Sequence, residues 1–405
     1  MSRNNIPFHA FIKERVLYCL TKGKNHDVLA IENAVDRRGE LDYKFSPLTL
    51  TRSDIAHRTR KAAFEIFEKD QGNHVNKKTV ALFFGGLSNE AEISIISAQN
   101  IIKYFDHKKY DLVLVYWHSD NQFYLLQNSD EIKSVSRKNR IKADDFSKLF
   151  DVALPITHGK YGEDGTLQGL FEMQKVPYCG CRVLSSSLCM DKAVFKTFLA
   201  GHRINQVSFD SIDLRGKKRS DVEKWAARIK DTFRLPVFIK PSNSGSSVGV
   251  VKVTDWNHLK KAVKEASRHD DKIVVEKGLV NPREIEVAVL GNYELTVSEP
   301  GELVVDGTFY DFDEKYNNNK TEVIIPAKLD AKAKEKIKST AAKAYRLCDC
   351  RGFARVDFFV EGNKIYLNEI NTLPGFTDIS MYPMLMKNTG ISYKKLINAI
   401  IGLAN

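Results

Sequence analysis

Residues 237–253 read VFIKPSNSGSSVGVVKV, a run of small residues between two apolar segments, and they decide how this chain folds. Val237–Ile239 and Val250–Val253 have the β-branched and aromatic composition of strands. Between them, the loop Lys240–Gly249 offers backbone amides that can approach phosphate oxygens, and Lys240 adds a positive charge beside them. The loop predicts phosphate binding, and a glycine-rich hairpin without a ligand is the alternative when the loop is taken alone.

Two common motifs are excluded for this loop. Gly245–Gly249 matches the G-x-S-x-G pattern of hydrolases, but that pattern must lead into a helix, and here it leads into a strand. The chain also contains no G-x-x-x-x-G-K followed by Ser or Thr, so the Walker A loop is absent.

The sequence on either side of the loop predicts a multidomain chain of α/β and α+β class. An open α/β sheet begins with the apolar run Thr79–Phe84, and an α+β unit surrounds the loop. A helix over 331–347, a hairpin over 353–371 and a helix over 390–403 follow. We expect four parts: a helical N-terminal extension (1–78), an α/β domain (79–180), a central unit (181–276) and a C-terminal unit (277–405).

The N-terminal extension is expected to be an ordered helical appendage. Apolar residues recur at helical spacing over 11–20 and 62–67. These stripes need burial, so the extension should pack on itself, on the outside of the remaining chain or on a partner subunit. The sequence does not indicate what it does.

Composition limits the classes of function. The chain has 405 residues, 43% of them hydrophobic and 28% charged, as in ordinary globular proteins. Its formal charge of +11 is spread along the chain rather than gathered in one patch, so we expect an anionic nucleotide substrate rather than a nucleic acid. We find no apolar run of membrane-spanning length and expect a cytoplasmic protein with buried, reduced cysteines.

A second group of residues lies on the predicted hairpin. Residues two apart on a strand share a face, so Arg355 pairs with Asp357, and Glu369 pairs with Asn371. Two carboxylates and an amide oxygen suit Mg²⁺, and Arg355 could neutralise charge on a phosphoryl group; a surface ion-pair ladder is the alternative.

If Asp357 and Glu369 hold one metal from facing positions, the register of the hairpin is fixed. Arg355 then lies opposite Asn371 and Glu361 opposite Ile365, with Gly362–Lys364 as the connection.

Two further segments carry weaker signals. Glu276–Leu279, with Glu284 beyond it, lies where two units meet and could read an adenine edge or a ribose. His158–Gly165 follows an apolar strand, at the sheet edge where α/β folds place ligands, although a capped turn is an equal alternative.

Taken together and in this order, these residues resemble the D-alanine:D-alanine ligases of the ATP-grasp superfamily over about residues 79–403. The resemblance rests on six motifs: Gly85–Ser94, His158–Gly169, Met190–Lys192, Lys240–Gly249, Gly307–Tyr316 and Asn368–Thr377. It implies an open α/β pre-ATP-grasp domain followed by a two-lobed ATP-grasp fold. It also implies a reaction in which ATP phosphorylates one D-alanine and the amine of a second D-alanine attacks the acyl phosphate, for peptidoglycan precursor synthesis.

The resemblance also implies roles for individual residues. Glu90 would hold the ammonium of the first D-alanine, with His158 near its carboxylate, and Ser246 and Tyr316 would link the lid loops, over 242–249 and 308–321, to Glu90. The remaining roles are those of ATP phosphate ligands (Lys192, Lys240), the adenosine site (Glu276, Lys277, Leu279, Glu284), ligands of two Mg²⁺ or Mn²⁺ ions (Asp357, Glu369, Asn371), oxyanion stabilisation (Arg355, Gly375) and the second substrate (Ser380, Met381).

Other products and another class of protein remain open. A relative of the same fold could make D-alanyl-D-serine or D-alanyl-D-lactate, and the chain could instead be a catalytically silent ATP-binding regulator. Tyr316 and Met381 favour D-alanine, because the relatives that form esters or use serine depart from these residues. A homodimer is kept open as well.

Overall fold

The computed structural model describes residues 29–35, 41–47, 77–305 and 321–404. The chain divides into two compact units, Met1–Asn76 and Lys77–Asn405, and each is described by itself. Within the described residues, none of the helices is both long enough and apolar enough to cross a membrane.

In the first unit, the described residues form an antiparallel pair of strands, β1 (Leu29–Val35) and β2 (Leu41–Pro47). The prediction of a helical extension is therefore wrong for these residues. Alternate residues over Leu41–Phe45 are apolar, and this period of two suits a strand rather than a helix. The two predicted helical stripes, over 11–20 and 62–67, lie outside the described residues.

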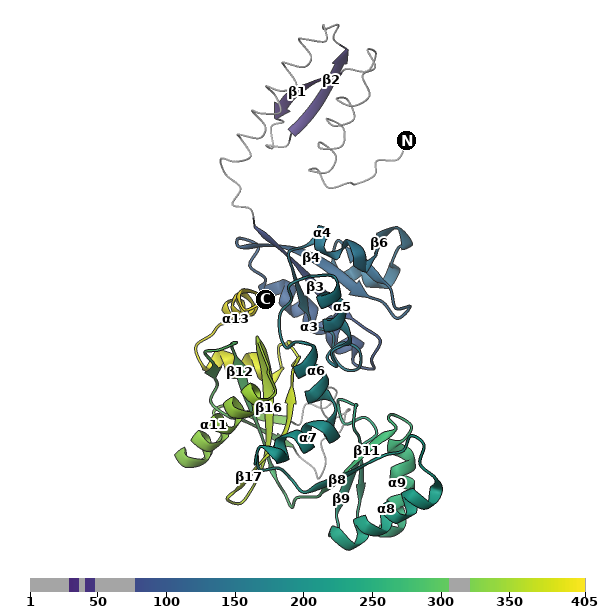
Figure 1. The fold of residues 1–405 in the computed structure, drawn as a ribbon. Helices are drawn as coiled ribbons and strands as arrows, with labels where there is room; N and C mark the ends of the chain where they lie inside the picture. The colour runs from purple at the N-terminus through teal and green to yellow at the C-terminus, as the bar shows by residue number, and fades with distance from the viewer. Residues whose placement is uncertain (1–28, 36–40, 48–76, 306–320, 405) are drawn as a thin grey trace. The chain divides into compact units, whose positions relative to one another are not determined.

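The second unit begins with a five-stranded sheet in the order β6-β5-β4-β3-β7 (Figure 1). Its centre is parallel, as the α/β pattern predicts, and its outer strands β5 and β6 pair antiparallel. The strands are β3 (Lys78–Gly85), β4 (Tyr110–Trp117), β5 (Phe123–Leu126), β6 (Arg140–Ile141) and β7 (Val152–Pro155). The carboxyl ends of β3 and β7 lead into the loops that carry Glu90 and His158, so both residues lie at one edge of the sheet.

Helices cover this sheet and connect it to the next lobe. The α-helices are α3 (Ala91–Tyr104), α4 (Phe146–Leu149), α5 (Thr166–Met173), α6 (Val183–Met190) and α7 (Lys192–Gly201), and the 3₁₀ helices are η1 (Ser129–Ser134), η2 (Arg137–Asn139) and η3 (Ala143–Asp145). The helices α6 and α7 are separated by Asp191 alone. The carboxylate of Asp191 caps α7 by accepting the Val194 N–H at 3.1 Å.

A cluster of aromatic rings forms the core beneath β3. Phe83 is fully buried and makes edge-to-face contacts with Phe123, Phe146, Phe150 and Phe171, at ring centroid distances of 4.9–5.8 Å. The positive ring edges of one aromatic residue lie against the negative face of another, which adds to the free energy gained from burial.

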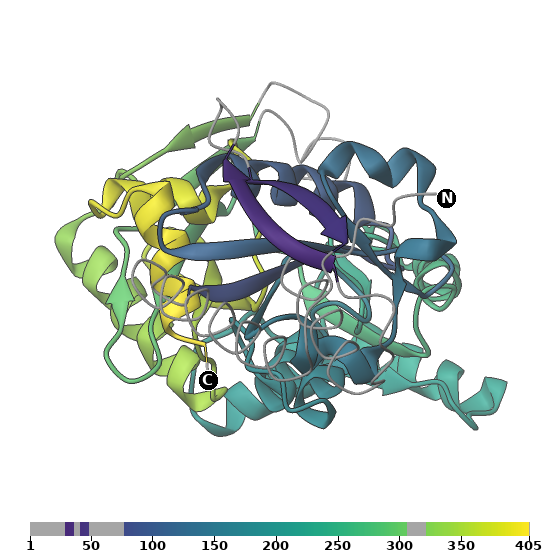
Figure 2. The ribbon, with the colours of Figure 1, turned by 90° about the horizontal axis from the view of Figure 1, so that it is seen from above.

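The central lobe is an antiparallel sheet in the order β10-β9-β11-β8. Its strands are β8 (Phe209–Asp213), β9 (Val237–Pro241), β10 (Val251–Val253) and β11 (Lys272–Lys277), and it packs against α8 (Arg219–Thr232), η4 (Trp256–His258) and α9 (Leu259–Ala266). The loop 242–250 joins β9 to β10, as the sequence predicts. Figures 1 and 2 agree that the teal helices of this lobe lie away from the yellow C-terminal helices.

The C-terminal lobe is built on the third sheet of this unit, with strands in the order β15-β14-β12-β16-β17 and β13 beside β12. The strands are β12 (Arg283–Leu290), β13 (Thr296–Val297), β14 (Gly301–Val305), β15 (Thr321–Ile324), β16 (Phe353–Glu361) and β17 (Lys364–Asn371); the helices are α11 (Ala331–Leu347), α12 (Met381–Asn388) and α13 (Tyr393–Gly402). The described cysteines, Cys179, Cys181, Cys189, Cys348 and Cys350, are buried and free, as expected.

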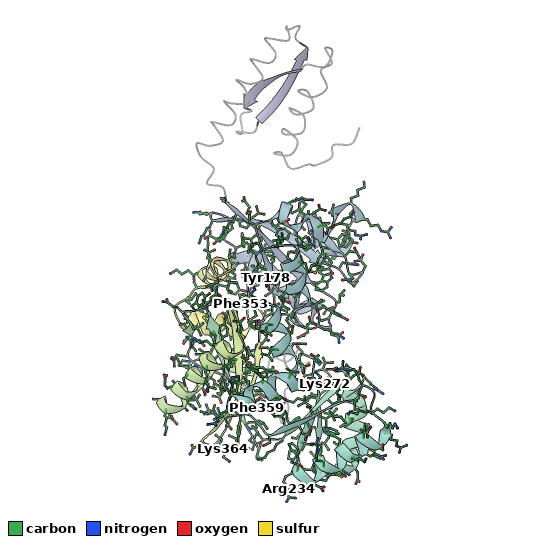
Figure 3. The ribbon with its side chains drawn as sticks, in the orientation of Figure 1. Tyr178, Arg234, Lys272, Phe353, Phe359 and Lys364 are labelled. Carbon is green, nitrogen blue, oxygen red and sulfur yellow. The ribbon has the colours of Figure 1, made fainter. Side chains whose placement is uncertain are left out.

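The hairpin of β16 and β17 confirms half of the predicted register. Asp357 lies opposite Glu369 and Arg355 opposite Asn371. Beyond Asp357 the register shifts by one residue, so Glu361 faces Lys364 and the prediction of Ile365 as its partner is wrong. Figure 3 shows the hairpin running from Phe353 through Phe359 to Lys364 at its tip.

A β-bulge explains the shift. Phe358 pairs with Leu367 although Asp357 pairs with Glu369, so Asn368 is an extra residue in β17. The bulge leaves Leu367 and Ile370 in the core while Asn368, Glu369 and Asn371 line a cavity. The connection at the tip is consequently the two residues Gly362 and Asn363 rather than three.

We expect the variant Phe83→Ala to lower the free energy of unfolding by about 3–5 kcal/mol, because it leaves a cavity among four aromatic rings. Ile96→Ala, at a position of α3 where the side chain is 48% exposed, is the control and should change stability by less than about 1 kcal/mol. Urea denaturation of the two variants tests this, and equal losses would contradict the packing described here.

Candidate active site

One cavity of about 570 Å³ lies between the three lobes of the second unit. Every predicted site residue that the structure describes contributes to its lining: Glu90, His158, Lys192, Lys240, Ser246, Glu276, Lys277, Leu279, Glu284, Arg355, Asp357, Glu369, Asn371, Gly375, Ser380 and Met381. Tyr316 and most of the predicted lid over 308–321 lie outside the described residues.

The hairpin carries the oxygen ligands. Asp357 and Glu369 face each other across β16 and β17, and Asn371 lies on the same face. Lys192 Nζ is 3.9 Å from Glu369 Oε2. Within the described residues there is no group of three His, Cys, Asp or Glu side chains placed to hold a metal. The set is instead two carboxylates and an amide oxygen, whose chemistry suits a hard cation such as Mg²⁺.

Arg355 is fixed beside these ligands. Its guanidinium donates to both oxygens of Asp357, from Nε at 2.8 Å and from Nη2 at 2.7 Å, and Nε also lies 2.9 Å from Glu286 Oε2 on β12. Burial alone would lower the pKa of Arg355, but Asp357 and Glu286 outweigh it and hold the pKa well above its usual value. Arg355 is thus a permanent cation whose position is set by two strands.

The loop 242–250 is held near its start by residues at the beginning of α7. Ser242 Oγ donates to Asp191 Oδ1 at 2.6 Å and accepts the Ala193 N–H at 2.9 Å, which ties the start of the loop to the start of α7. Lys192 Nζ donates to the carbonyl of Ser244 at 2.6 Å. Lys192 therefore orders the loop as well as facing the cavity.

Ser246 connects this loop to the first lobe of the second unit by donating a hydrogen bond from its hydroxyl to Glu90 Oε1. Ser246 and Ser247 both have positive φ angles, of 48° and 59°, which are uncommon for residues with side chains. Two glycines approach Glu90 closely, because a Cβ on Gly159 or Gly245 would lie 2.5 or 2.9 Å from Glu90 Oε2. This corner has no room for larger residues.

His158 is not free to bind a ligand in this structure. Its Nδ1 lies 3.0 Å from the carbonyl of Leu373, and its Nε2 lies 3.3 Å from Ser97 Oγ. Burial lowers the pKa of His158, so the ring is neutral, with the Nδ1 proton donated to the carbonyl. The position of His158 near a substrate carboxylate stays a prediction. In this structure, His158 connects the end of β7 to the loop that follows β17.

Ser97 and Asn100 were not predicted as site residues. Ser97 Oγ accepts the N–H of Phe376 at 3.2 Å, and Asn100 Nδ2 donates to the carbonyl of Phe376 at 2.9 Å. The two side chains, three residues apart on α3, thus hold both backbone groups of the residue next to Gly375. Their spacing on one helix face is a signal, but the sequence does not reveal that the partner lies about 280 residues away.

Ser380 and Met381, which were predicted to bind the second substrate, follow Phe376 in the chain. Ser380 Oγ accepts the N–H of Thr377 at 2.9 Å, and a Cβ on Gly375 would meet that oxygen at the same distance, so Gly375 lets the chain pass close to Ser380. Met381 is 5% exposed and packs in the core as well as lining the cavity. Packing therefore accounts for part of its role.

Glu276, which was predicted for the adenosine site, lines the cavity and is paired with lysines. Its carboxylate contacts two ammonium groups, Lys240 at 2.7 Å and Lys196 at 3.1 Å. Lys196 was not predicted, although it lies one helical turn after Lys192. Lys277, Leu279 and Glu284 line the same end of the cavity.

Comparisons with known proteins agree over almost all of the second unit. Family models described as "D-ala D-ala ligase N-terminus" and "D-ala D-ala ligase C-terminus" match residues 79–181 and 198–402. A protein from Caldicellulosiruptor bescii named D-alanine–D-alanine ligase is 42% identical over 82% of this chain and 96% of its own length. One of the same name from Acetivibrio thermocellus is 41% identical over 81% of this chain and 96% of its own.

Solved structures of two ligases, one of them a D-Ala:D-Ser ligase, are similar to this chain. The VanG D-Ala:D-Ser ligase from Enterococcus faecalis has a TM-score of 0.72 and 33% identity, covering 81% of this chain and 99% of its own. The D-alanine-D-alanine ligase from Coxiella burnetii has a TM-score of 0.69 and 32% identity, covering 81% of this chain and 94% of its own.

We expect Glu163 to make stability depend on pH. This carboxyl group lines the cavity and accepts the N–H of Gly159 at 3.0 Å; burial, together with the charge of Glu90, raises its pKa from 4.5 to about 8. Because the folded pKa exceeds the unfolded one, its contribution to stability is fully present below about pH 4.5 and is lost as the pH rises through about 8.

Glu163→Gln keeps an oxygen for the Gly159 N–H and cannot ionise. The variant should therefore gain stability relative to wild type as the pH is raised from about 5 to about 9. Thermal midpoints across this range provide the test, with Glu294→Gln at an exposed site as the control. Parallel curves for wild type and Glu163→Gln would show that Glu163 does not titrate as described.

Proposed function

This chain belongs to the D-alanine–D-alanine ligase family, and we propose that the described cavity carries out the family's reaction with the residue roles given below. The enzyme is an ADP-forming ATP-grasp ligase that joins two D-alanines into D-alanyl-D-alanine, which serves peptidoglycan synthesis. The observation that carries the assignment of roles is that one cavity gathers phosphate-binding lysines, oxygen ligands and an oxyanion site.

In the first step, the carboxylate of one D-alanine attacks the γ-phosphorus of ATP and ADP leaves. We assign the phosphates to Lys192, Lys240 and the amides of the 242–249 loop, because these groups face the cavity together. Asp357, Glu369 and Asn371 would hold Mg²⁺, as two ions, which neutralises phosphate charge when bound. The purine and ribose are assigned to Glu276, Lys277, Leu279 and Glu284.

In the second step, the amine of the other D-alanine attacks the acyl carbon, and phosphate leaves from the tetrahedral intermediate. Arg355 and the Gly375 amide are placed to stabilise the oxyanion of that intermediate. Ser97, Asn100 and His158 keep the Gly375 loop in position. We assign Glu90 to the ammonium group of the first D-alanine, with His158 near the carboxylate of the same substrate. Ser246 and Tyr316 are assigned to the lids that close over Glu90. Ser380 and Met381 are assigned to the second D-alanine.

Other features remain proposals of the same kind. We propose the domain limits 79–180, 181–276 and 277–405, and a cytoplasmic location because ATP is the co-substrate. A homodimer is supported by the exposed apolar side chains of Met173 and Leu184, 80% and 64% exposed, on the neighbouring helices α5 and α6.

We expect Asp357→Asn to lower kcat by about 100-fold or more, because a metal that neutralises phosphoryl charge loses a charged ligand. Phosphate release from ATP and D-alanine at saturating Mg²⁺ measures this. The control is Asp349→Asn, a 53% exposed aspartate that also pairs with an arginine and should leave kcat unchanged. Near-wild-type turnover of Asp357→Asn would overturn the assignment of the metal ligands.

The function itself is tested by product analysis. With D-alanine as the only amino acid, we expect phosphate release and D-alanyl-D-alanine. The apolar Met381 offers no hydrogen-bond donor to a serine hydroxyl or to lactate, so D-serine should enter more slowly, by about 100-fold at most, since an apolar pocket rejects a hydroxyl only weakly. Faster incorporation of D-serine or D-lactate than of D-alanine, at equal concentrations near neutral pH, would favour the alternative product.

A further inference from the structure

Lys196 is a buried lysine with no role in the assignments above. It lies on α7, and its side chain is only 1% exposed. A lysine is almost never fully buried unless its ammonium is paired, because removing the charge from water is costly. The partner of this ammonium therefore indicates what the residue does.

The partner is Glu276, whose carboxylate lies between two lysines. Oε1 is 3.1 Å from Lys196 Nζ, and Oε2 accepts a hydrogen bond from Lys240 Nζ at 2.7 Å. The Glu276 side chain is 3% exposed and that of Lys240 is 14% exposed. Burial would raise the pKa of Glu276, but the two lysines outweigh it and lower the pKa to about 2. Burial lowers the pKa of Lys196, and the carboxylate of Glu276 opposes that change. With both ammonium groups paired to one carboxylate, the cluster contains two cations and one anion.

The two lysines differ in their relation to the cavity. Lys240 and Glu276 line it, whereas Lys196 lies behind them and is not part of the lining. Without Lys196, the carboxylate of Glu276 would neutralise Lys240 just where an anionic phosphate chain is to bind. With Lys196, the cluster keeps a surplus of one positive charge.

We propose that Lys196 is a positioning residue of the nucleotide site, which offsets the charge of Glu276 so that the Lys240 end of the cluster stays positive toward the phosphates of ATP. This inference rests on the proposed function, because it takes ATP as the ligand. Lys196 acts through Glu276 and does not touch the nucleotide. Glu369, at the metal-binding end of the cavity, is a further charge that acts on Lys196.

A purely structural role is the competing explanation. In that case the Lys196–Glu276 pair would only fasten α7 to β11, which are in contact. The two roles differ in what they require. A fastening is absent both when Lys196 alone is lost and when both partners are lost, so by itself it would not restore phosphate affinity in a double variant, whereas the electrostatic role makes that affinity follow the sum of the charges.

The test compares Lys196→Met with the double variant Lys196→Met/Glu276→Gln, using the full-length chain and calorimetric titration with inorganic triphosphate. This probe is chosen because Glu276 is itself assigned to the purine and ribose of ATP, which triphosphate lacks. The single variant removes one positive charge, so the dissociation constant of triphosphate should rise by about tenfold or more. The KM for D-alanine should change little. The double variant restores the original net charge, so its dissociation constant should return to within about threefold of the wild-type value.

Two further variants complete the experiment. Lys338 lies on α11, outside the cavity lining, and its Nζ is 2.6 Å from Glu299 Oε1. Lys338→Met should therefore leave triphosphate binding unchanged. Lys196→Arg keeps the charge and should retain affinity for triphosphate. If Lys196→Met does not fold, Lys196→Gln carries the same comparison, because an amide can still donate to Glu276.

An unchanged dissociation constant in Lys196→Met, or a double variant that binds triphosphate as poorly as the single one, would overturn the proposal. Its failure is distinguishable from failure of the proposed function. Wild-type protein that binds ATP but releases no phosphate with D-alanine would refute the proposed roles, while the dissociation constants would still decide the role of Lys196.

Discussion

The pairing of β16 with β12 on one side and β17 on the other is the constraint on which the site depends. It places Asp357 opposite Glu369 and brings Glu286 from β12 to the guanidinium of Arg355. A shift of one residue in either pairing would send these side chains to the other face of the sheet, among apolar residues. The register of three strands therefore decides whether an oxygen-lined site exists at all. The bulge at Asn368 then ends the strict alternation just where the cavity needs consecutive polar residues.

The three lobes meet at the reacting centre, and each supplies something that the others cannot. The central lobe contributes the phosphate-binding loop, which reaches Glu90 through Ser246. The first lobe of the second unit contributes α3, whose Ser97 and Asn100 hold the backbone of Phe376. An acyl phosphate reacts with water, so a site that forms only when these lobes are together limits that loss. The left-handed backbone at Ser246 and Ser247 is consistent with a loop held in place by its contacts rather than by its own preference.

Local sequence patterns predict much of the fold and of the candidate site, and long-range packing determines the rest of both. The facing pair Asp357 and Glu369 follows from the period of two along a strand, but the bulge depends on how the sheet packs and leaves no local pattern. The helix α12 was not predicted, because Pro383 lies in its first turn and resembles a break rather than a start. The roles of Ser97 and Lys196 could not be predicted, because a buried serine or lysine on an amphipathic helix has no sequence pattern that names its distant partner.

The cavity also shows how one pocket can attract opposite charges without neutralising itself. Asp357 is hydrogen-bonded to the fixed cation Arg355, and burial raises the pKa of Glu163 to about 8, which favours its protonated form near neutral pH. A carboxylate that is hydrogen-bonded to a buried arginine cannot move to a lysine and cancel its charge. Lys192 donates to the uncharged carbonyl of Ser244 and lies 3.9 Å from Glu369 Oε2. The lysines therefore remain available to an anionic ligand, and the same principle makes Glu276 need a second cation if Lys240 is to stay among them.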